Sequence, residues 1–310
     1  MVSLEKGGQP AAVTNDRVAI TGASGFLGGA LVPFLTAGGH TVRTIGRGAG
    51  SDARWDPAAG RLDAGALDGI DAVIHLAGSS VAERWTARTK REIRESRLQG
   101  TRLIAEACAR ASVRPEVLIS ASAVGIYGSR GDEKLDERSA CGNDFLADVG
   151  QQWEAATAPA RDAGIRVIHL RTGIVLNPAG GALAKMLTPM RFGAGGRLGS
   201  GKQWMSWISR EDWVGAVHHA LQTPGLSGPV NLTAPEPVTN STFTETLGRI
   251  VHRPTLASVP AFVLRTIFGE MAEGTILASQ RAHPAALERS GFGFAHPTLA
   301  SALRFELGLL

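Results

Sequence analysis

The 310-residue sequence is poor in cysteine and tyrosine, with two cysteines and a single tyrosine, Tyr127. Cys108 falls in a predicted helix and Cys141 in a predicted loop, without the spacing of a metal site, so we expect no disulfide scaffold and no bound metal. This cysteine usage favours a reducing compartment, and the cytoplasm is the expected location. No apolar run approaches the ~20 residues that span a bilayer, so we expect no membrane partner.

The sequence also has no long run of charges of one sign. Its formal net charge of +4 comes from dispersed arginines, with no interleaved aromatic stripe. We therefore expect no nucleic-acid partner, because such partners are bound by clustered basic residues and stacking aromatics. Residues 1–16 are polar and lack a continuous apolar segment, which predicts a disordered lead-in and not a secretory signal.

One stretch, residues 17–35, combines the features of a strand, a tight turn and a helix. An apolar run at residues 18–20 leads into three spaced glycines and then into leucines at helical spacing; the glycines are Gly22, Gly25 and Gly28, and the leucines are Leu27, Leu31 and Leu35. Glycines at such a turn let the backbone approach a pyrophosphate at the start of the helix. The stretch predicts a dinucleotide site, and the alternative is an ordinary strand-to-helix turn.

The end of the second predicted strand, residues 41–45, indicates which dinucleotide is bound. An acidic residue at this position accepts a ribose 2′-OH, whereas an arginine accommodates a 2′-phosphate. Gly46 and Arg47 occupy the position here, so the sequence predicts NADP(H). Arg43 either assists or faces solvent.

Strands alternate with helices along the first half of the chain. Strands are predicted within residues 71–78, 117–122 and 164–171, and helices over 86–110 and around Trp153. The alternation predicts an α/β fold with a Rossmann-type, doubly wound parallel sheet. His75, inside one apolar strand, is interpreted as a hydrogen-bonded core residue in preference to a catalytic base.

The chain is long enough for one large domain carrying a smaller lobe. We expect the dinucleotide-binding domain over residues 17–175, with later segments, including about 205–233, returning to it. Glycine-rich loops from residue 176 onward predict that 176–310 forms mainly a substrate-side lobe and a C-terminal helical segment.

Several ordered motifs together resemble the extended short-chain dehydrogenase/reductase superfamily over about residues 17–306; they are Thr21–Gly28, Ile74–Gly78, Ser120–Ser122 with Tyr127–Gly128, and Leu170–Val175. Others look like its atypical, epimerase-like branch, among them Arg84–Thr86, Trp153–Ala156, Gln203–Ile208 and Ser279–Arg281. That branch carries a short C-terminal domain of unassigned function and has no settled substrate.

The resemblance implies a set of cofactor contacts. Carried over motif by motif, the residues expected to bind NADP(H) are Gly22, Ser24, Gly25, Phe26, Leu27, Gly28, Arg47, Leu76, Ala77, Gly78, Ser120 and Arg171.

This chain lacks the proton-transfer pair that the resemblance leads one to expect. The superfamily uses Tyr-x-x-x-Lys, in which the lysine lowers the tyrosine pKa. Tyr127 is followed four residues later by Gly131, and Leu146 and Gly150 stand where the pair is expected. Arg97 replaces the helix asparagine that often completes the proton relay.

Two catalytic candidates remain, Ser122 and Tyr127. Ser122 matches the superfamily's catalytic serine and is expected either to orient a carbonyl or to satisfy backbone groups at the strand end. Tyr127, with an ordinary pKa near 10, needs a cation beside it to act as an acid. Lys185 and Arg97 are the candidates for that cation.

The segment around residues 203–208 supplies the candidate substrate contacts. Two tryptophans three residues apart are costly to expose, so Trp207, beside Ile208, is interpreted as core. Gln203 and Trp204 follow a glycine-rich loop and are predicted to form the substrate-side wall.

Three functions stay open. The first is an NADP(H)-dependent oxidoreductase that acts on a small carbonyl or sugar-type molecule, as a monomer or homodimer. The second is a redox sensor that binds NADPH without turnover. The third is a nucleotide-sugar epimerase, which ranks last because it needs retained NAD and a base, and the sequence indicates neither.

Overall fold

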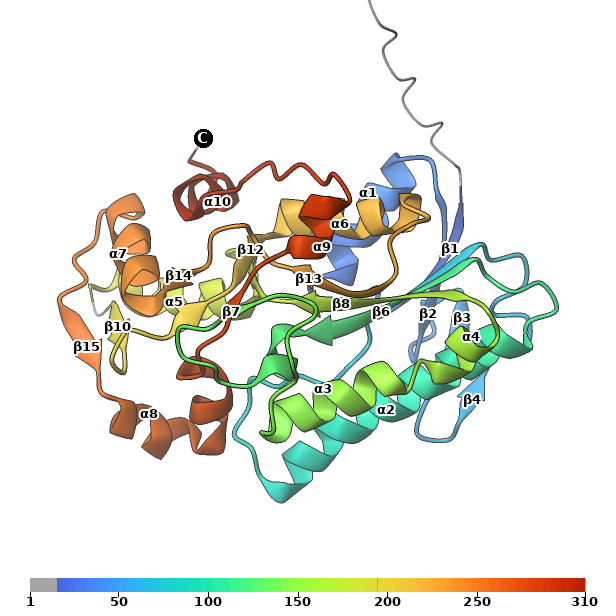
Figure 1. The fold of residues 1–310 in the computed structure, drawn as a ribbon, viewed down its shortest axis with the longest axis horizontal. Coiled ribbons are helices and arrows are strands. Elements are labelled where there is room, and N and C mark those ends of the chain that lie inside the picture. Colours follow the sequence, from blue (N-terminus) through green and yellow to red (C-terminus); the bar gives the residue numbers. More distant parts are fainter. Residues whose placement is uncertain (1–15, 194, 310) are drawn as a thin grey trace, which may run out of the picture.

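The computed structural model describes residues 16–193 and 195–309, which are built around one eight-stranded sheet (Figure 1). In order across the sheet, the strands are β13 (Gly228–Leu232), β8 (Arg166–Thr172), β6 (Val117–Ala123), β5 (Ala72–His75), β1 (Arg17–Thr21), β2 (Thr41–Gly46), β3 (Ala53–Asp56) and β4 (Arg61–Leu62). Neighbouring strands are parallel except for β3 and β4, which are antiparallel. The predicted doubly wound α/β sheet is confirmed.

The predicted lead-in, residues 1–16, lies outside the described residues except for Asp16. The carboxylate of Asp16 accepts a hydrogen bond from the Gln222 side chain at 2.8 Å, and its carbonyl accepts one from the Thr41 backbone at 3.0 Å. Asp16 is therefore tied to the folded chain.

The β3 and β4 strands form a short hairpin that the sequence analysis did not predict. The hairpin turns at residues 57–60, where the Ala59 backbone nitrogen donates to the Asp56 carboxylate at 3.1 Å. Strands of four and two residues carry too little apolar alternation to be recognised from sequence.

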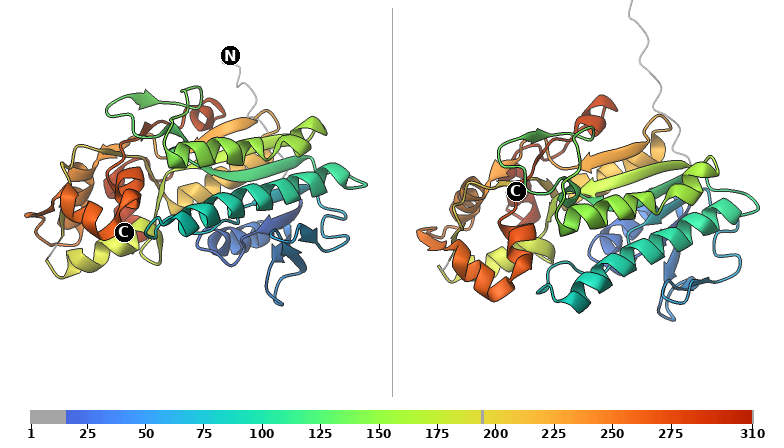
Figure 2. Two further views of the ribbon diagram at one scale, coloured as in Figure 1. Left: turned by 90° about the horizontal axis from the view of Figure 1, so that it is seen from below. Right: turned by 60° about the horizontal axis from the view of Figure 1, so that its bottom comes forward.

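Helices cover both faces of the sheet (Figures 1 and 2). One face carries α1 (Gly28–Ala37) and α6 (Arg210–Gln222); the other carries α2 (Ala87–Arg110), α3 (Phe145–Ala155) and α4 (Ala158–Asp162). Side-chain caps fix three of the starts, with Thr86, Asp144 and Ser209 accepting hydrogen bonds from backbone nitrogens of the first turn. Among the described helices, none combines the length and apolar character needed to cross a bilayer.

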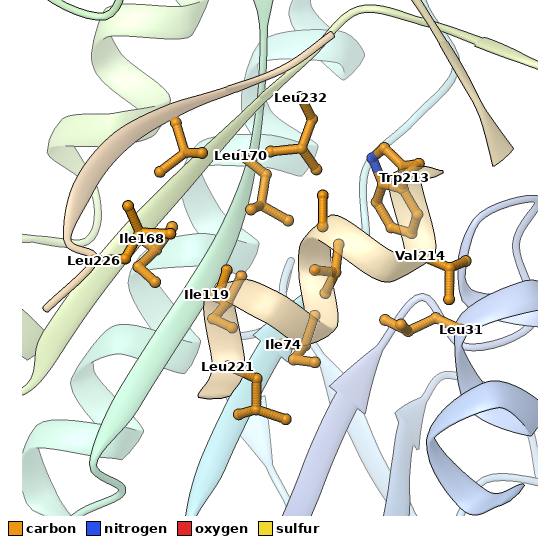
Figure 3. Close-up of a cluster of buried hydrophobic side chains, with 14 of the residues drawn as sticks. Leu31, Ile74, Ile119, Ile168, Leu170, Trp213, Val214, Leu221, Leu226 and Leu232 are labelled. Atoms are coloured by element: carbon orange, nitrogen blue, oxygen red, sulfur yellow. The ribbon is translucent and has the colours of Figure 1, made fainter. Parts of the chain in front are cut away.

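The largest core cluster fills the space between α6 and the sheet (Figure 3). Trp213 on α6 has no exposed surface, and its indole nitrogen donates to the Thr172 hydroxyl at the end of β8, at 3.2 Å. Leu31 from α1 and Ile74 from β5 pack in the same cluster. Each fully buried side chain of this size contributes about 1.5–3 kcal/mol, so this cluster holds α6 to the sheet strands that carry the site.

The smaller lobe is made of short elements beyond β8, on the left in Figure 1. Its strands occur in pairs: β12 (Trp207–Ser209) with β9 (Ile174–Leu176), β11 (Trp204–Met205) with β14 (Val238–Thr239), and β10 (Gly196–Leu198) with β15 (Ala257–Val259). Its helices are α5 (Gly181–Arg191), α7 (Asn240–Ile250), α8 (Ala261–Phe268) and η2 (Ala272–Ile276), a single π-helical turn.

The C-terminal segment connects this lobe with the sheet. β16 (Arg281–Ala282) pairs with β7 (Lys134–Leu135), and α9 (Ala285–Arg289) buries Leu287 in the core of the main sheet. α10 (Leu299–Glu306) ends in a buried glutamate, Glu306. One carboxyl oxygen of Glu306 accepts from the Arg210 backbone nitrogen at 2.7 Å, and the other accepts from the Asn177 amide at 2.6 Å. The last helix therefore caps the start of α6 and also fixes Asn177, the residue that follows β9.

We predict that Glu306→Ala lowers the free energy of unfolding by about 3 kcal/mol, because the Arg210 N–H and the Asn177 amide lose a buried acceptor. Chemical denaturation measures the change. Glu245→Ala, which removes an exposed carboxylate on α7, is the matched control and should change stability by less than about 0.5 kcal/mol. Equal stability of the two variants would contradict this role of Glu306.

Candidate functional site: a dinucleotide cavity and a buried polar network

The turn between β1 and α1 requires glycine for two different reasons. Gly22 has a φ of +73°, and a Cβ built on it would lie 3.0 Å from the Ala77 backbone nitrogen. A Cβ on Gly28 would overlap the carbonyl oxygen of Gly22, so the helix start packs directly on the turn. The N-cap residue, Leu27, supplies no side-chain cap. The N–H groups of Gly29, Ala30 and Leu31 already donate to the carbonyls of Gly25 and Leu27. Within the described residues, the N–H groups of Ser24, Phe26, Leu27 and Gly28 make no hydrogen bond, so the turn before α1 and its first residue can bind an anionic ligand.

A cavity of about 760 Å³ opens at the carboxyl ends of β1, β2 and β5, beside this turn. Seven of the predicted cofactor residues line it: Gly22, Ser24, Gly25, Arg47, Leu76, Ala77 and Gly78. In parallel α/β sheets, ligands bind outside the carboxyl ends of the strands, which is where these residues meet.

Other residues of the cavity wall were missed by the sequence analysis. Thr44, Ser51, Trp55, Asp56, Pro57 and Ala58 come from β2, β3 and the hairpin, and Ser79, Glu92, Glu95, Ser96 and Gln99 come from the loop after β5 and from α2. The sequence did contain one indication of this wall. Trp55 is a large aromatic residue directly before Asp56 and Pro57, which are typical of a turn.

The remaining predicted cofactor residues do not line the cavity. The Phe26 side chain packs toward the smaller lobe, where a Cβ on Gly180 would lie 2.6 Å from its ring. Leu27 and Gly28 start the helix, and Ser120 is fully buried, with its hydroxyl donating to the Ala121 carbonyl at 3.4 Å. These residues build the site without facing the cavity.

Arg43 does not assist at the tip of β2. Its guanidinium donates to three backbone carbonyls of the chain before β5, at Gly65, Ala66 and Asp68, over 3.1–3.2 Å. Arg47 is therefore the arginine that β2 presents to the cavity.

His75 is the core histidine that its apolar strand predicted. It has no exposed surface, and Nδ1 lies 2.7 Å from the Thr21 hydroxyl. Burial lowers the pKa of His75 to about 4, so the ring is neutral at physiological pH. Its edge contact with Trp55 fixes the ring behind the cavity wall.

A buried ion pair joins Arg171 on β8 to Glu154 on α3. Nε and Nη2 of Arg171 donate to the two carboxylate oxygens at 2.8 and 2.9 Å, and Nη1 donates to the Tyr127 hydroxyl at 3.0 Å and the Glu137 carbonyl at 3.3 Å. All three nitrogens thus donate within the protein. Burial is the largest single effect and opposes both charges, but the hydrogen bonds and the charge attraction together outweigh it, so the pKa of Glu154 falls and that of Arg171 rises. Four of the five N–H groups of Arg171 are used in this arrangement, which leaves one N–H of Nη2 for the predicted cofactor contact.

His169 lies beside this pair without adding a charge to it. Its Nδ1 is 3.8 Å from a Glu154 oxygen, and its Nε2 lies 2.9 Å from the Thr157 hydroxyl. Burial lowers the pKa of His169 in spite of the neighbouring carboxylate, so we assign it a neutral ring at pH 7.

The structure does not bring Tyr127 to the cavity. Its side chain has no exposed surface, and its hydroxyl donates to Asn231 Oδ1 at 2.7 Å while accepting from Arg171. Burial raises the pKa of Tyr127 to about 12, although the Arg171 guanidinium and the Asn231 bond act in the opposite direction. The cation beside Tyr127 is thus Arg171, and neither Lys185 nor Arg97 is bonded to it in the described structure.

Ser122 belongs to the same network. It is 3% exposed, and its hydroxyl donates to a Glu154 oxygen at 2.7 Å. A serine hydroxyl has one proton to donate, so the proton that would polarise a carbonyl is directed at Glu154.

The side chains of the two predicted substrate contacts, Gln203 and Trp204, are bonded to other parts of the protein. The Gln203 amide donates to the carbonyls of Leu198 and Ile276, at 2.9 and 3.2 Å. The Trp204 indole nitrogen donates to Asp132 at 2.8 Å, and the Arg281 guanidinium lies 4.0 Å from its ring centre. Neither residue lines the dinucleotide cavity. Trp207 is fully buried, as predicted for a core residue.

Residues 18–232 match the profile of the NAD dependent epimerase/dehydratase family, more than half of the chain. The chain belongs to this family. The match ends with β13, the last strand of the main sheet, and a second profile, described as a domain of unknown function (DUF1731), matches residues 259–306. The resemblance inferred from the motifs is therefore confirmed in both parts.

Relatives of known sequence and structure cover almost the whole chain. Epimerase family protein Mb2239 of Mycobacterium bovis is 47% identical over 94% of this chain and 98% of its own. The crystal structure of human epimerase family protein SDR39U1 with NADPH has a TM-score of 0.88, with 32% identity over 95% of this chain and 100% of that one. A nucleoside-diphosphate sugar epimerase of Corynebacterium glutamicum has a TM-score of 0.79, with 39% identity over 96% of this chain and 59% of that one.

This protein has a single tyrosine, so ultraviolet absorbance reports the ionisation of Tyr127 directly. We predict that the folded protein shows no tyrosinate signal until pH approaches about 12, whereas the chain unfolded in guanidinium titrates near its ordinary value of about 10. A pKa raised in the folded state stabilises the fold below the unfolded value, and this contribution is lost as pH rises from about 10 to about 12. Titration of the folded protein near 10 would place the hydroxyl in solvent.

Proposed function

We propose that this protein binds NADP(H) in the cavity at the carboxyl ends of β1, β2 and β5 and acts as an oxidoreductase on a small carbonyl or sugar-type molecule. The observation that carries the proposal is that two features occur at the same cavity. The first is the glycine turn, which leaves no room for a side chain at Gly22 or Gly28, and the second is Arg47 at the tip of β2. NADPH in the human relative's structure supports the cofactor assignment.

Each part of the cavity suits one part of the dinucleotide. The unbonded N–H groups of the turn from Ser24 to Gly28 suit the diphosphate, and Arg47 suits a 2′-phosphate because a guanidinium pairs strongly with phosphate oxygens. The wall around Trp55 and Pro57 provides apolar surface for the adenosine. When bound, the nicotinamide supplies the hydride, and the protein positions it.

We assign Ser122 and Tyr127 to the polar network in place of proton transfer. The Ser122 proton is directed at Glu154, and the Tyr127 proton at Asn231, inside the protein. A reductase with this arrangement takes its proton from water or from the substrate. We propose that Gln203 and Trp204 shape the lobe beside the substrate without contacting it directly.

A second candidate function is NADPH binding without turnover, as in a redox sensor. The hydrogen bonds of Ser122 and Tyr127 favour it, because both hydroxyl protons are already donated inside the protein. Isothermal titration with NADPH, combined with a turnover screen of carbonyls and nucleotide sugars, separates the candidates. Binding with NADPH oxidation supports the oxidoreductase, binding without oxidation of any substrate supports the sensor, and absence of binding contradicts both.

For Ser122→Ala we predict a loss of stability of about 1 kcal/mol, because Glu154 keeps both Arg171 bonds. On any substrate that the screen identifies, kcat should fall by less than about tenfold, since the serine proton is not offered to the substrate. A serine that polarised the carbonyl would instead cost about 10²–10³-fold in kcat, and such a loss would return Ser122 to the catalytic centre.

For Arg47→Ala we predict a loss of NADPH affinity of about tenfold or more, with NADH affinity nearly unchanged, because NADH has no 2′-phosphate to pair. Titration calorimetry with both cofactors measures the effect. Arg54→Ala, which removes an exposed arginine from the neighbouring strand, is the control and should change neither affinity. If both cofactors lose affinity equally in the Arg47 variant, Arg47 is not the phosphate contact.

A further inference from the structure

Arg97, on α2, lies directly behind the cavity wall that Gly78 and Ser79 form. A Cβ built on Gly78 would lie 3.6 Å from both Cγ and Cζ of Arg97. Nη1 donates to the carbonyls of Ser79 at 3.0 Å and Ile93 at 3.1 Å, and the guanidinium stacks over the Trp153 ring, 4.8 Å from its centre. The side chain is therefore held in one place by backbone and aromatic contacts.

No carboxylate balances this charge in the part of the chain that the structure describes. Neighbouring arginines on the same helix have partners, with Arg94 paired to Asp148 at 2.6 Å and Arg88 paired to Glu92 at 2.8 Å. Glu95 lines the cavity but is exposed, so solvent screens it.

Burial alone perturbs Arg97, as expected for a cation with no partner. It lowers the pKa of Arg97 to about 10, which leaves the guanidinium protonated at neutral pH. The charge is therefore permanent under physiological conditions, and its field acts on whatever occupies the cavity beside it.

The position of Arg97 along the cavity decides which part of a dinucleotide it faces. Arg47 marks one end of the cavity, at β2, and Ser79 and Ser96, the neighbours of Arg97, line the other side of β1. With a 2′-phosphate at Arg47, the dinucleotide extends across β1 toward β5 and β6, so its nicotinamide half comes to the side of Arg97. This step rests on the proposed function.

We propose that Arg97 is a specificity-determining residue that makes the site select the reduced cofactor, NADPH, over NADP⁺. The oxidised nicotinamide ring carries a positive charge, and the reduced ring is neutral. An unbalanced, half-buried guanidinium on the nicotinamide side repels the oxidised ring and leaves the reduced ring unaffected. The Trp153 ring and the carbonyls of Ser79 and Ile93 hold the guanidinium in place, so Arg97 does not move away to relieve the repulsion.

The test compares the affinities of NADPH and NADP⁺ by titration calorimetry, which needs no turnover. The wild-type protein should bind NADPH more tightly than NADP⁺. Arg97→Met keeps an unbranched side chain but removes the charge, and it should shift the ratio of the two dissociation constants toward NADP⁺ by roughly fivefold to tenfold. Arg97→Lys keeps the charge and should keep most of the preference.

The matched control is Arg102→Met, which removes an exposed, paired arginine five residues further along α2 and should leave the ratio unchanged. Equal affinities of the wild-type protein for the two cofactors, or an equal loss for both in Arg97→Met, would overturn the proposal. If the Met variant fails to fold, the proposal is still tested by the wild-type preference for NADPH and by whether Arg97→Lys keeps that preference. Absence of binding of either cofactor to the wild type would instead reject the proposed function.

Discussion

The buried charge of Arg171 is the constraint on which the centre of this protein depends. Arg171 is 5% exposed, so its charge requires a paired carboxylate and satisfied donors, and Glu154 on α3 and Tyr127 after β6 supply them. Ser122 then donates to the same carboxylate. The hydroxyl groups of the two catalytic candidates, Ser122 and Tyr127, therefore form hydrogen bonds to this buried ion pair.

The main sheet and the cofactor turn could be predicted from the sequence because both depend on patterns among residues that are close together in the chain. The turn from Gly22 to Gly28 depends on spacing within seven residues, and the strand and helix periods fix the sheet. The network could not be predicted, since Tyr127 meets Asn231 across 104 residues and Arg171 meets Glu154 between a strand and a helix. The cavity wall around Trp55 could not be predicted either, because the strands of its hairpin are too short to show an alternation of apolar and polar residues.

The C-terminal segment ties the two parts of the molecule at several points. Glu306 caps α6, Asp212 on α6 accepts from the His296 backbone at 3.0 Å, and the backbone of Ala286 donates to Glu137 at 3.0 Å. Through Glu137, which also accepts from the Asn231 backbone at 3.1 Å, these contacts reach the partner of Tyr127. The region that matches a domain of unknown function is built into the core of the family fold and is not a separate unit.

The central claim, that the cavity beside the glycine turn is an NADP(H) site, is tested most directly by a crystal structure of the protein grown with NADPH. The diphosphate should lie against the N–H groups of the turn from Ser24 to Gly28, and the 2′-phosphate against Arg47. A bound dinucleotide elsewhere, or one with its 2′-phosphate directed away from Arg47, would contradict the claim.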